Sequence, residues 1–91
     1  MALEYKNLME DVVVQNAITM MKVRGCCTCD ACTSDVVAYA LNHVPPRYVA
    51  TRKGQMLAKI SNYALQYKAD VVAAVCEAID VVKESPRHDD R

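Results

Sequence analysis

Large aromatic side chains are scarce in this 91-residue chain, which has no tryptophan and no phenylalanine, so that all five aromatic residues are tyrosines. The interior must therefore be filled by short aliphatic side chains, above all by the 13 valines and 12 alanines. A chain of this length forms one domain, and we expect residues 1–91 to be that domain, ordered over about 4–86. Because a core of short aliphatic side chains is thin, we expect a second copy of the chain to add burial, and we predict a homodimer.

Other absences exclude whole classes of protein. Eleven basic and eleven acidic residues leave no net charge, which argues against a polybasic protein that binds nucleic-acid polymers. No segment approaches the roughly 20 apolar residues of a membrane span, and the first residues do not resemble a signal peptide. We therefore expect a cytoplasmic protein without a membrane partner. With two glycines and no serine–histidine–aspartate set in a catalytic context, an enzyme is not expected.

The hydrophobic pattern predicts a mainly α fold with three main helices and a short β-hairpin. Apolar residues recur at three- and four-residue steps in three stretches, which predicts helices over 4–22, 30–44 and from about 62 or 67 to 83. Gly25 is expected to end the first helix, and Pro45-Pro46 the second. The residues expected to face the core are Met9, Val13, Ala17 and Met20 on the first helix, Val37, Ala40, Leu41 and Val44 on the second, and Val71, Val75, Ala78 and Val82 on the third.

Four of the five cysteines fall within seven residues, Cys26-Cys27-Thr28-Cys29-Asp30-Ala31-Cys32. In the cytosol such cysteines are more often thiols or metal ligands than disulfides. The spacing Cys29-x-x-Cys32 is typical of a metal knuckle, and Cys27 lies close by, so we predict that these three sulfurs hold a structural zinc ion.

The fourth zinc ligand has three candidates. His88, on the tail just past Pro86, completes the predicted set, while Cys26 and Cys76 are alternatives. Cys76 also fits a small buried hydrophobic residue of the third helix. The rival interpretation of the cysteine run is a redox dithiol, which usually follows a strand, whereas here a helix is expected to lead in.

Positive charge gathers in residues 46–60, the basic segment. It carries Arg47, Arg52, Lys53 and Lys59 and no acidic residue, whereas 1–45 and 61–91 each have a net charge of −2. The segment is predicted to form a hairpin, with strands over 47–51 and 55–60 joined by a turn over 52–54. An anionic ligand is expected here first, and a hairpin kept soluble by its charges would give the same pattern.

The run from Cys27 to Thr51 resembles the ComFB family of late competence development proteins. Its most specific part is Asp35-x-x-Ala-x-Ala-Leu-Asn-x-x-Pro-Pro-x-Tyr48. Asn7-Leu8-Met9-Glu10 and Ser85-Pro86-Arg87 are similar to the ends of that family, so that the resemblance covers about residues 5 to 88. The chain departs from the family in its doubled Cys26-Cys27 and in a tail that offers His88 rather than a cysteine.

The resemblance implies a small homodimeric helical domain of the bacterial cytosol, in which the cysteine run holds zinc as a stabiliser. It also implies a ligand class, because certain relatives, notably cyanobacterial ones, are receptors for cyclic di-GMP or cyclic di-AMP. A cyclic dinucleotide has two phosphates and two bases, which suit guanidinium, ammonium and aromatic side chains. We therefore predict a ligand site made of Arg47, Tyr48, Thr51, Arg52, Lys53 and Gly54. Tyr48 fits a core tyrosine as well.

The sequence is compatible with two functions. One is a receptor that binds a cyclic dinucleotide and changes its affinity for a downstream protein. The other is a zinc-stapled structural or adaptor protein of the competence (DNA uptake) machinery with no small ligand. A thiol–disulfide enzyme ranks third.

Overall fold

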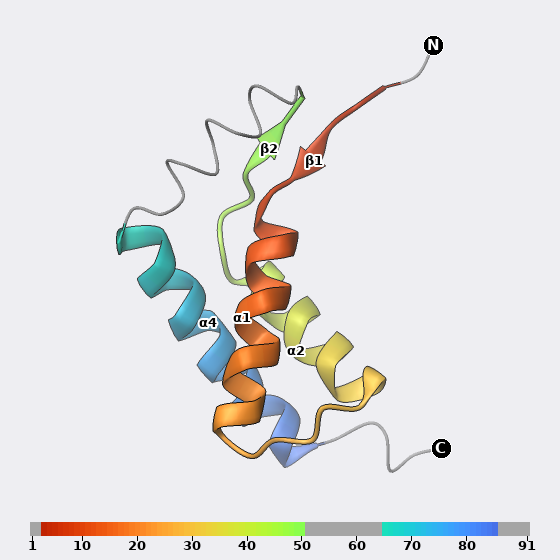
Figure 1. The fold of residues 1–91 in the computed structure, drawn as a ribbon, viewed down its shortest axis with the longest axis vertical. Coiled ribbons are helices and arrows are strands. Elements are labelled where there is room, and N and C mark those ends of the chain that lie inside the picture. Colours follow the sequence, from red (N-terminus) through yellow and green to blue (C-terminus); the bar gives the residue numbers. More distant parts are fainter. Residues whose placement is uncertain (1–2, 51–64, 86–91) are drawn as a thin grey trace.

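Three helices form most of the described chain, and a two-stranded sheet lies at one end of them (Figure 1). The structure is a computed structural model that describes residues 3–50 and 65–85. In chain order the elements are β1 (Lys6–Asn7), α1 (Met9–Val23), α2 (Asp30–Asn42), β2 (Tyr48–Val49) and α4 (Leu65–Glu84). Over these residues, the predicted mainly α class with three helices is confirmed. Within the described ranges, no helix has the length and apolar character that crossing a membrane requires.

The core lies where each helix packs against the other two. Val13 and Ala17 of α1 and Val75 of α4 are fully buried, as the pattern predicts. On α2 the buried stripe is Cys32, Val36 and Ala40, rotated away from the predicted Val37 and Leu41, which are half-buried. The reason is that the Cys32 side chain points inward at the start of the helix, and steps of four residues then carry the stripe through Val36 and Ala40.

The predicted start of the first helix is wrong by five residues. The oxygen Oδ1 of Asn7 accepts a hydrogen bond from the Met9 N–H at 3.1 Å, which is the bond of an N-cap side chain. Leu8 already has helical backbone angles, so Asn7 caps α1 and the residues before it are extended. The second helix is also shorter than predicted: α2 ends at Asn42, whereas the pattern predicts an end at residue 44.

The strand predicted at Tyr48 is confirmed, but its described partner is the N-terminal strand. β1 and β2 pair antiparallel, with Lys6 opposite Val49 and Asn7 opposite Tyr48. The predicted turn over 52–54 and the second hairpin strand over 55–60 lie outside the described residues.

Gly25 ends α1 as predicted, through a Schellman motif. Its φ is +68°, the Gly25 N–H donates to the Lys22 carbonyl at 3.2 Å, and the Cys26 N–H donates to the Met21 carbonyl at 2.8 Å. This turn directs the chain from α1 into the cysteine run.

Replacing Gly25 with alanine is expected to lower the free energy of unfolding by about 1 kcal/mol, because a left-handed backbone conformation is costly for a residue with a Cβ. The cost comes from the backbone alone, since no atom beyond the two neighbouring residues lies within 4 Å of the added Cβ. Gly25→Asn should lose less, because asparagine tolerates this conformation. Urea unfolding measures both variants, and an alanine variant as stable as the parent would contradict the expectation.

Candidate functional site

The cysteine run lies in the connection from α1 to α2 and continues into the first turn of α2. Cys29 is the N-cap residue of α2, and its Sγ accepts a hydrogen bond from the Cys32 N–H at 3.4 Å. The Thr33 N–H in turn donates to the Cys29 carbonyl at 2.9 Å. The helix start therefore fixes the positions of Cys29 and Cys32 relative to each other.

The sulfurs of Cys27, Cys29 and Cys32 all lie within 4.8 Å of one another. Sulfurs bound at about 2.3 Å to a tetrahedral zinc ion are about 3.8 Å apart, so the three side chains need to close by at most about 1 Å to bind one ion. Cys27 is exposed, Cys29 is half-buried and Cys32 is buried, so the cluster reaches from the core to the surface. These three predicted ligands are thus brought together, and the set fits zinc.

Ionisation of the Cys32 thiol is disfavoured by its surroundings. Burial raises the pKa of the Cys32 thiol, and the neighbouring sulfurs of Cys29 and Cys27 raise it further. A thiolate in this place therefore needs a positive charge beside it, and a divalent cation shared by three sulfurs supplies one.

Two of the three candidates for the fourth zinc ligand lie within the described residues. Neither Cys26 nor Cys76 belongs to the group of close sulfurs within the described residues. Cys26 packs against the core, whereas Cys76 is half-buried on α4. His88 lies outside the described residues, and its role as a ligand remains a prediction.

Arg24 connects the start of this loop to α4. Its guanidinium donates to Asp80 Oδ1 at 2.6 Å and to the Cys76 carbonyl at 3.2 Å. Asp80 raises the pKa of Arg24, through this hydrogen bond first and through its charge second. The contact lies at the surface, so it contributes little to stability.

The redox interpretation lacks the local structure that it needs. All five cysteines lie within the described residues, and none of them is in a disulfide. The element before the motif is the helix α1 and not a strand, as the sequence predicts.

The second candidate region is a clasp, by which we mean β1 and β2 together with the bonds that tie them to Arg47. The Arg47 N–H donates to Asn7 Oδ1 at 2.8 Å, and the Arg47 carbonyl accepts from the Leu8 N–H at 2.7 Å. Both backbone groups of Arg47 are therefore held by the residues that start α1. The clasp and the cysteine cluster lie at opposite ends of α1, which is about 22 Å long (Figure 1).

Two of the six predicted ligand-binding residues lie in this clasp. Arg47 is half-buried, and Tyr48 is 62% exposed, so Tyr48 is not the core tyrosine that the sequence also permitted. The other four, Thr51, Arg52, Lys53 and Gly54, lie outside the described residues.

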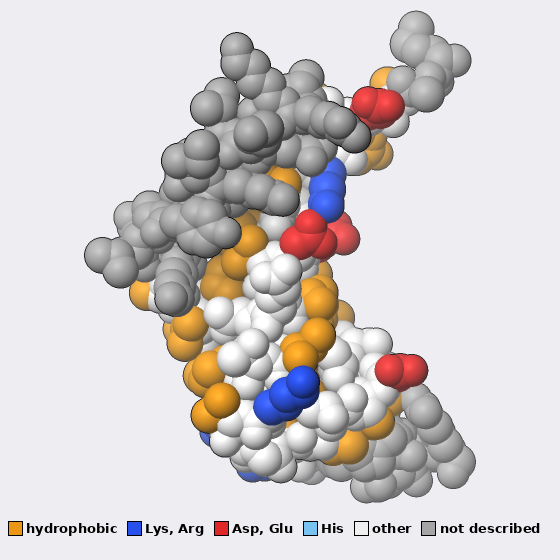
Figure 2. Space-filling model, in the orientation of Figure 1, with side chains coloured by type: hydrophobic (Ala, Val, Ile, Leu, Met, Phe, Trp, Pro, Cys, Tyr) orange, Lys and Arg blue, Asp and Glu red, His pale blue; other side chains and the backbone are white. Residues whose placement is uncertain are grey.

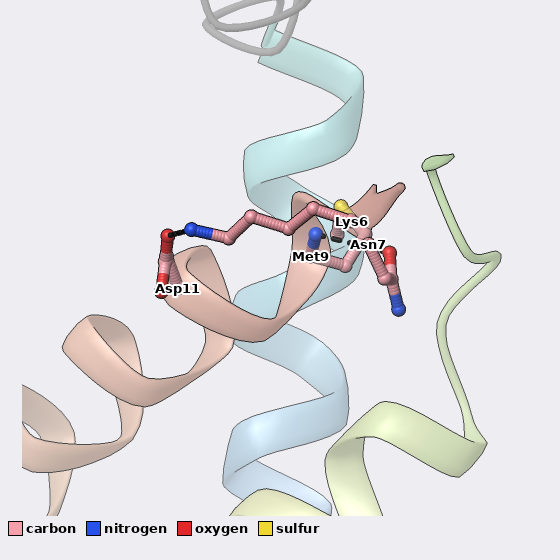
Figure 3. Close-up of polar contacts among 4 residues, drawn as sticks. All are labelled: Lys6, Asn7, Met9 and Asp11. Carbon is pink, nitrogen blue, oxygen red and sulfur yellow. Dashed lines mark hydrogen bonds and ion pairs between the residues drawn. The ribbon is translucent and has the colours of Figure 1, made fainter. Parts of the chain in front are cut away.

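Sequence reasoning missed the residues on the other strand of the clasp. Figure 3 shows the Asn7 side chain beside the Met9 amide, while the Lys6 side chain extends away to Asp11, at an Nζ–Oδ2 distance of 2.6 Å. A signal for Asn7 was present, because asparagine followed three positions later by Glu10 is the pattern of a helix N-terminus. No local pattern indicated that the same side chain also binds Arg47.

Within the described residues, three packed helices carry a cysteine cluster of the kind that binds metal at one end, and a two-stranded sheet, whose second strand follows Arg47, at the other. The family model described as late competence development protein ComFB matches residues 6–86 of the chain. The chain therefore belongs to the ComFB family, as its motifs indicated.

A protein sequence and a solved structure, both of ComFB from Bacillus subtilis, agree with this assignment. Competence protein ComFB of strain 168 is 34% identical over 67 residues, which cover 74% of this chain and 68% of that protein. A solved structure described as the structural characterization of the late competence protein ComFB has a TM-score of 0.73 and 30% identity, and the match covers 90% of this chain and 91% of that one.

Proposed function

We propose that this protein is a non-enzymatic receptor for a cyclic dinucleotide, cyclic di-GMP or cyclic di-AMP, in the cytoplasm. The observation that carries the proposal is the position of Arg47 and Tyr48 at the start of the basic segment. Arg47 is fixed at its N–H and at its carbonyl, and the ring of the adjacent Tyr48 is largely exposed. Arg47 thus supplies a guanidinium that can bind a phosphate, and the next residue supplies a ring that can stack on a base.

Zinc and a second copy of the chain belong to the same proposal. Cys27, Cys29 and Cys32 hold a structural zinc ion, with the fourth ligand from His88, Cys76 or Cys26. The homodimer is supported by the thin valine and alanine core and by apolar side chains that reach the surface on the helices (Figure 2). Val14 and Ile18 of α1, one turn apart, and Val81 of α4 are each more than one-third exposed. Sedimentation of a monomer at micromolar concentration would reject the dimer.

Replacing Arg47 with alanine is expected to weaken cyclic-dinucleotide binding roughly ten- to hundredfold, because a charge-assisted contact contributes about 1.5–3 kcal/mol. Calorimetry with cyclic di-GMP and cyclic di-AMP measures the effect, and added salt should weaken binding as well. Arg24→Ala is the matched control, since it removes the same charge at the other end of α1.

The same titration decides between the two functions. If the parent protein binds neither nucleotide with a dissociation constant below about 100 μM, the receptor proposal is wrong. The protein is then better described as a zinc-stapled adaptor of the competence machinery, with a downstream protein as its partner in place of a small ligand.

A further inference from the structure

We propose that the N-terminal strand is part of the ligand site, in which Tyr5 is a binding residue for a purine base and Asn7 is the positioning residue of Arg47. This inference rests on the proposed function, because it assigns two more residues to the same site. The clasp brings residues 5–7 against residues 47–49.

The side-chain oxygen of Asn7 accepts two backbone hydrogen bonds. Oδ1 accepts from the Met9 N–H at 3.1 Å and from the Arg47 N–H at 2.8 Å. Both partners are backbone donors, so the atom between them must be the amide oxygen and not the amide nitrogen. A single acceptor thus caps α1 and holds the backbone that carries the Arg47 guanidinium.

Tyr5 adds a second ring beside Tyr48. The two ring centroids are 6.2 Å apart at an interplanar angle of 60°, an edge-to-face pair. Tyr5 is 70% exposed and Tyr48 is 62% exposed, so each ring keeps most of its surface in contact with water. A purine that packs on these rings buries apolar surface and leaves the tyrosine hydroxyls in water, and the phosphate attached to it lies toward a cation.

In the proposed site, Arg47 is the cation that this phosphate meets. Arg47 is adjacent to Tyr48, and its backbone is fixed by Asn7 and Leu8. We therefore assign base contact to the tyrosine pair and phosphate contact to Arg47.

Asn7 also caps α1, and a capping role alone would affect stability without affecting the ligand. Three variants separate the roles. Asn7→Asp keeps an acceptor of the same reach for both contacts, Asn7→Ser keeps a good N-cap with a shorter side chain that does not reach Arg47, and Asn7→Ala removes both contacts.

The first arm of the experiment compares these three variants by urea unfolding, by amide hydrogen exchange and by calorimetry with cyclic di-GMP and cyclic di-AMP. We expect faster exchange at the Arg47 amide and about two- to tenfold weaker binding in the serine and alanine variants, whereas aspartate should restore the parent exchange rate. Only the alanine variant should also lose the stability that the N-cap hydrogen bond contributes. Asn7→Ser with parent exchange and parent affinity would overturn the positioning role.

The second arm compares Tyr5→Ala with Tyr5→Phe. Removing the ring should weaken binding roughly five- to hundredfold, whereas phenylalanine should bind like the parent, because it keeps the ring. Leu3→Ala is the control, since Leu3 is an apolar residue 78% exposed on the same N-terminal arm. Equal affinities of Tyr5→Ala and the parent would overturn the inference and leave the proposed function standing. A parent protein that binds neither nucleotide would instead overturn the proposed function, and this ligand site with it.

Discussion

Replacing Val75 with aspartate is expected to abolish folding. Val75 is completely buried on α4, where that helix packs against α1 and α2. Within the described residues, the structure buries no polar or charged side chain, so the new carboxylate would have no partner in the core. An unpaired buried carboxylate costs roughly 4 kcal/mol or more, which approaches the stability of about 5–15 kcal/mol that is typical of a small domain.

Circular dichroism and urea unfolding of Val75→Asp test this expectation. Ala73→Asp is the matched control, because residue 73 is exposed on the same helix and the change introduces the same charge. The control should keep the helical signal and a midpoint close to that of the parent. Similar midpoints for the two aspartate variants would show that α4 does not pack through Val75.

Replacing Cys32 with serine is expected to remove zinc and to lower the free energy of unfolding by at least about 3 kcal/mol. Two losses combine in this variant. Cys32 is one of the three clustered sulfurs, and its side chain is also 1% exposed within the core, where a serine hydroxyl would be buried. Metal analysis of protein purified without added zinc, together with thermal unfolding, measures both losses.

Two further cysteine variants separate the metal from the packing. Cys27→Ser should lose zinc with less effect on the core, because Cys27 is exposed, whereas Cys26→Ser should keep zinc. A chelator should lower the melting temperature of the parent protein and leave cyclic-dinucleotide affinity unchanged, because the cluster and the clasp lie at opposite ends of α1. If protein purified under reducing conditions contains no metal, the zinc proposal is wrong.

Hydrophobic periodicity predicted the helices well, because each helix buries one face against the other two. The repeats through Val13 and Ala17 and through Val71 and Val75 identify the buried sides of α1 and α4. The same method placed the start of α1 too early. Leu8 is buried and extends the apolar pattern backward, while the actual boundary is set by the Asn7 side chain.

The candidate sites were predictable only where the signal is local. The spacing of Cys27, Cys29 and Cys32 is short, so the sequence alone was enough to predict their cluster. The pairing of β2 with β1 joins residues about forty positions apart, and such a contact leaves no pattern in either segment. Tyr5 and Asn7 were missed as site residues for this reason.

The clasp also has a consequence for the order of folding. The bond from Arg47 to Asn7 closes a chain segment of 40 residues that contains both α1 and α2. Closing such a segment while it is flexible would cost much entropy for very few hydrogen bonds, but the cost is largely met once the two helices have packed. We therefore expect the clasp to form after the helical core, and interactions that form late mainly slow unfolding. The first residues of the chain thus stabilise a helical core that has already formed.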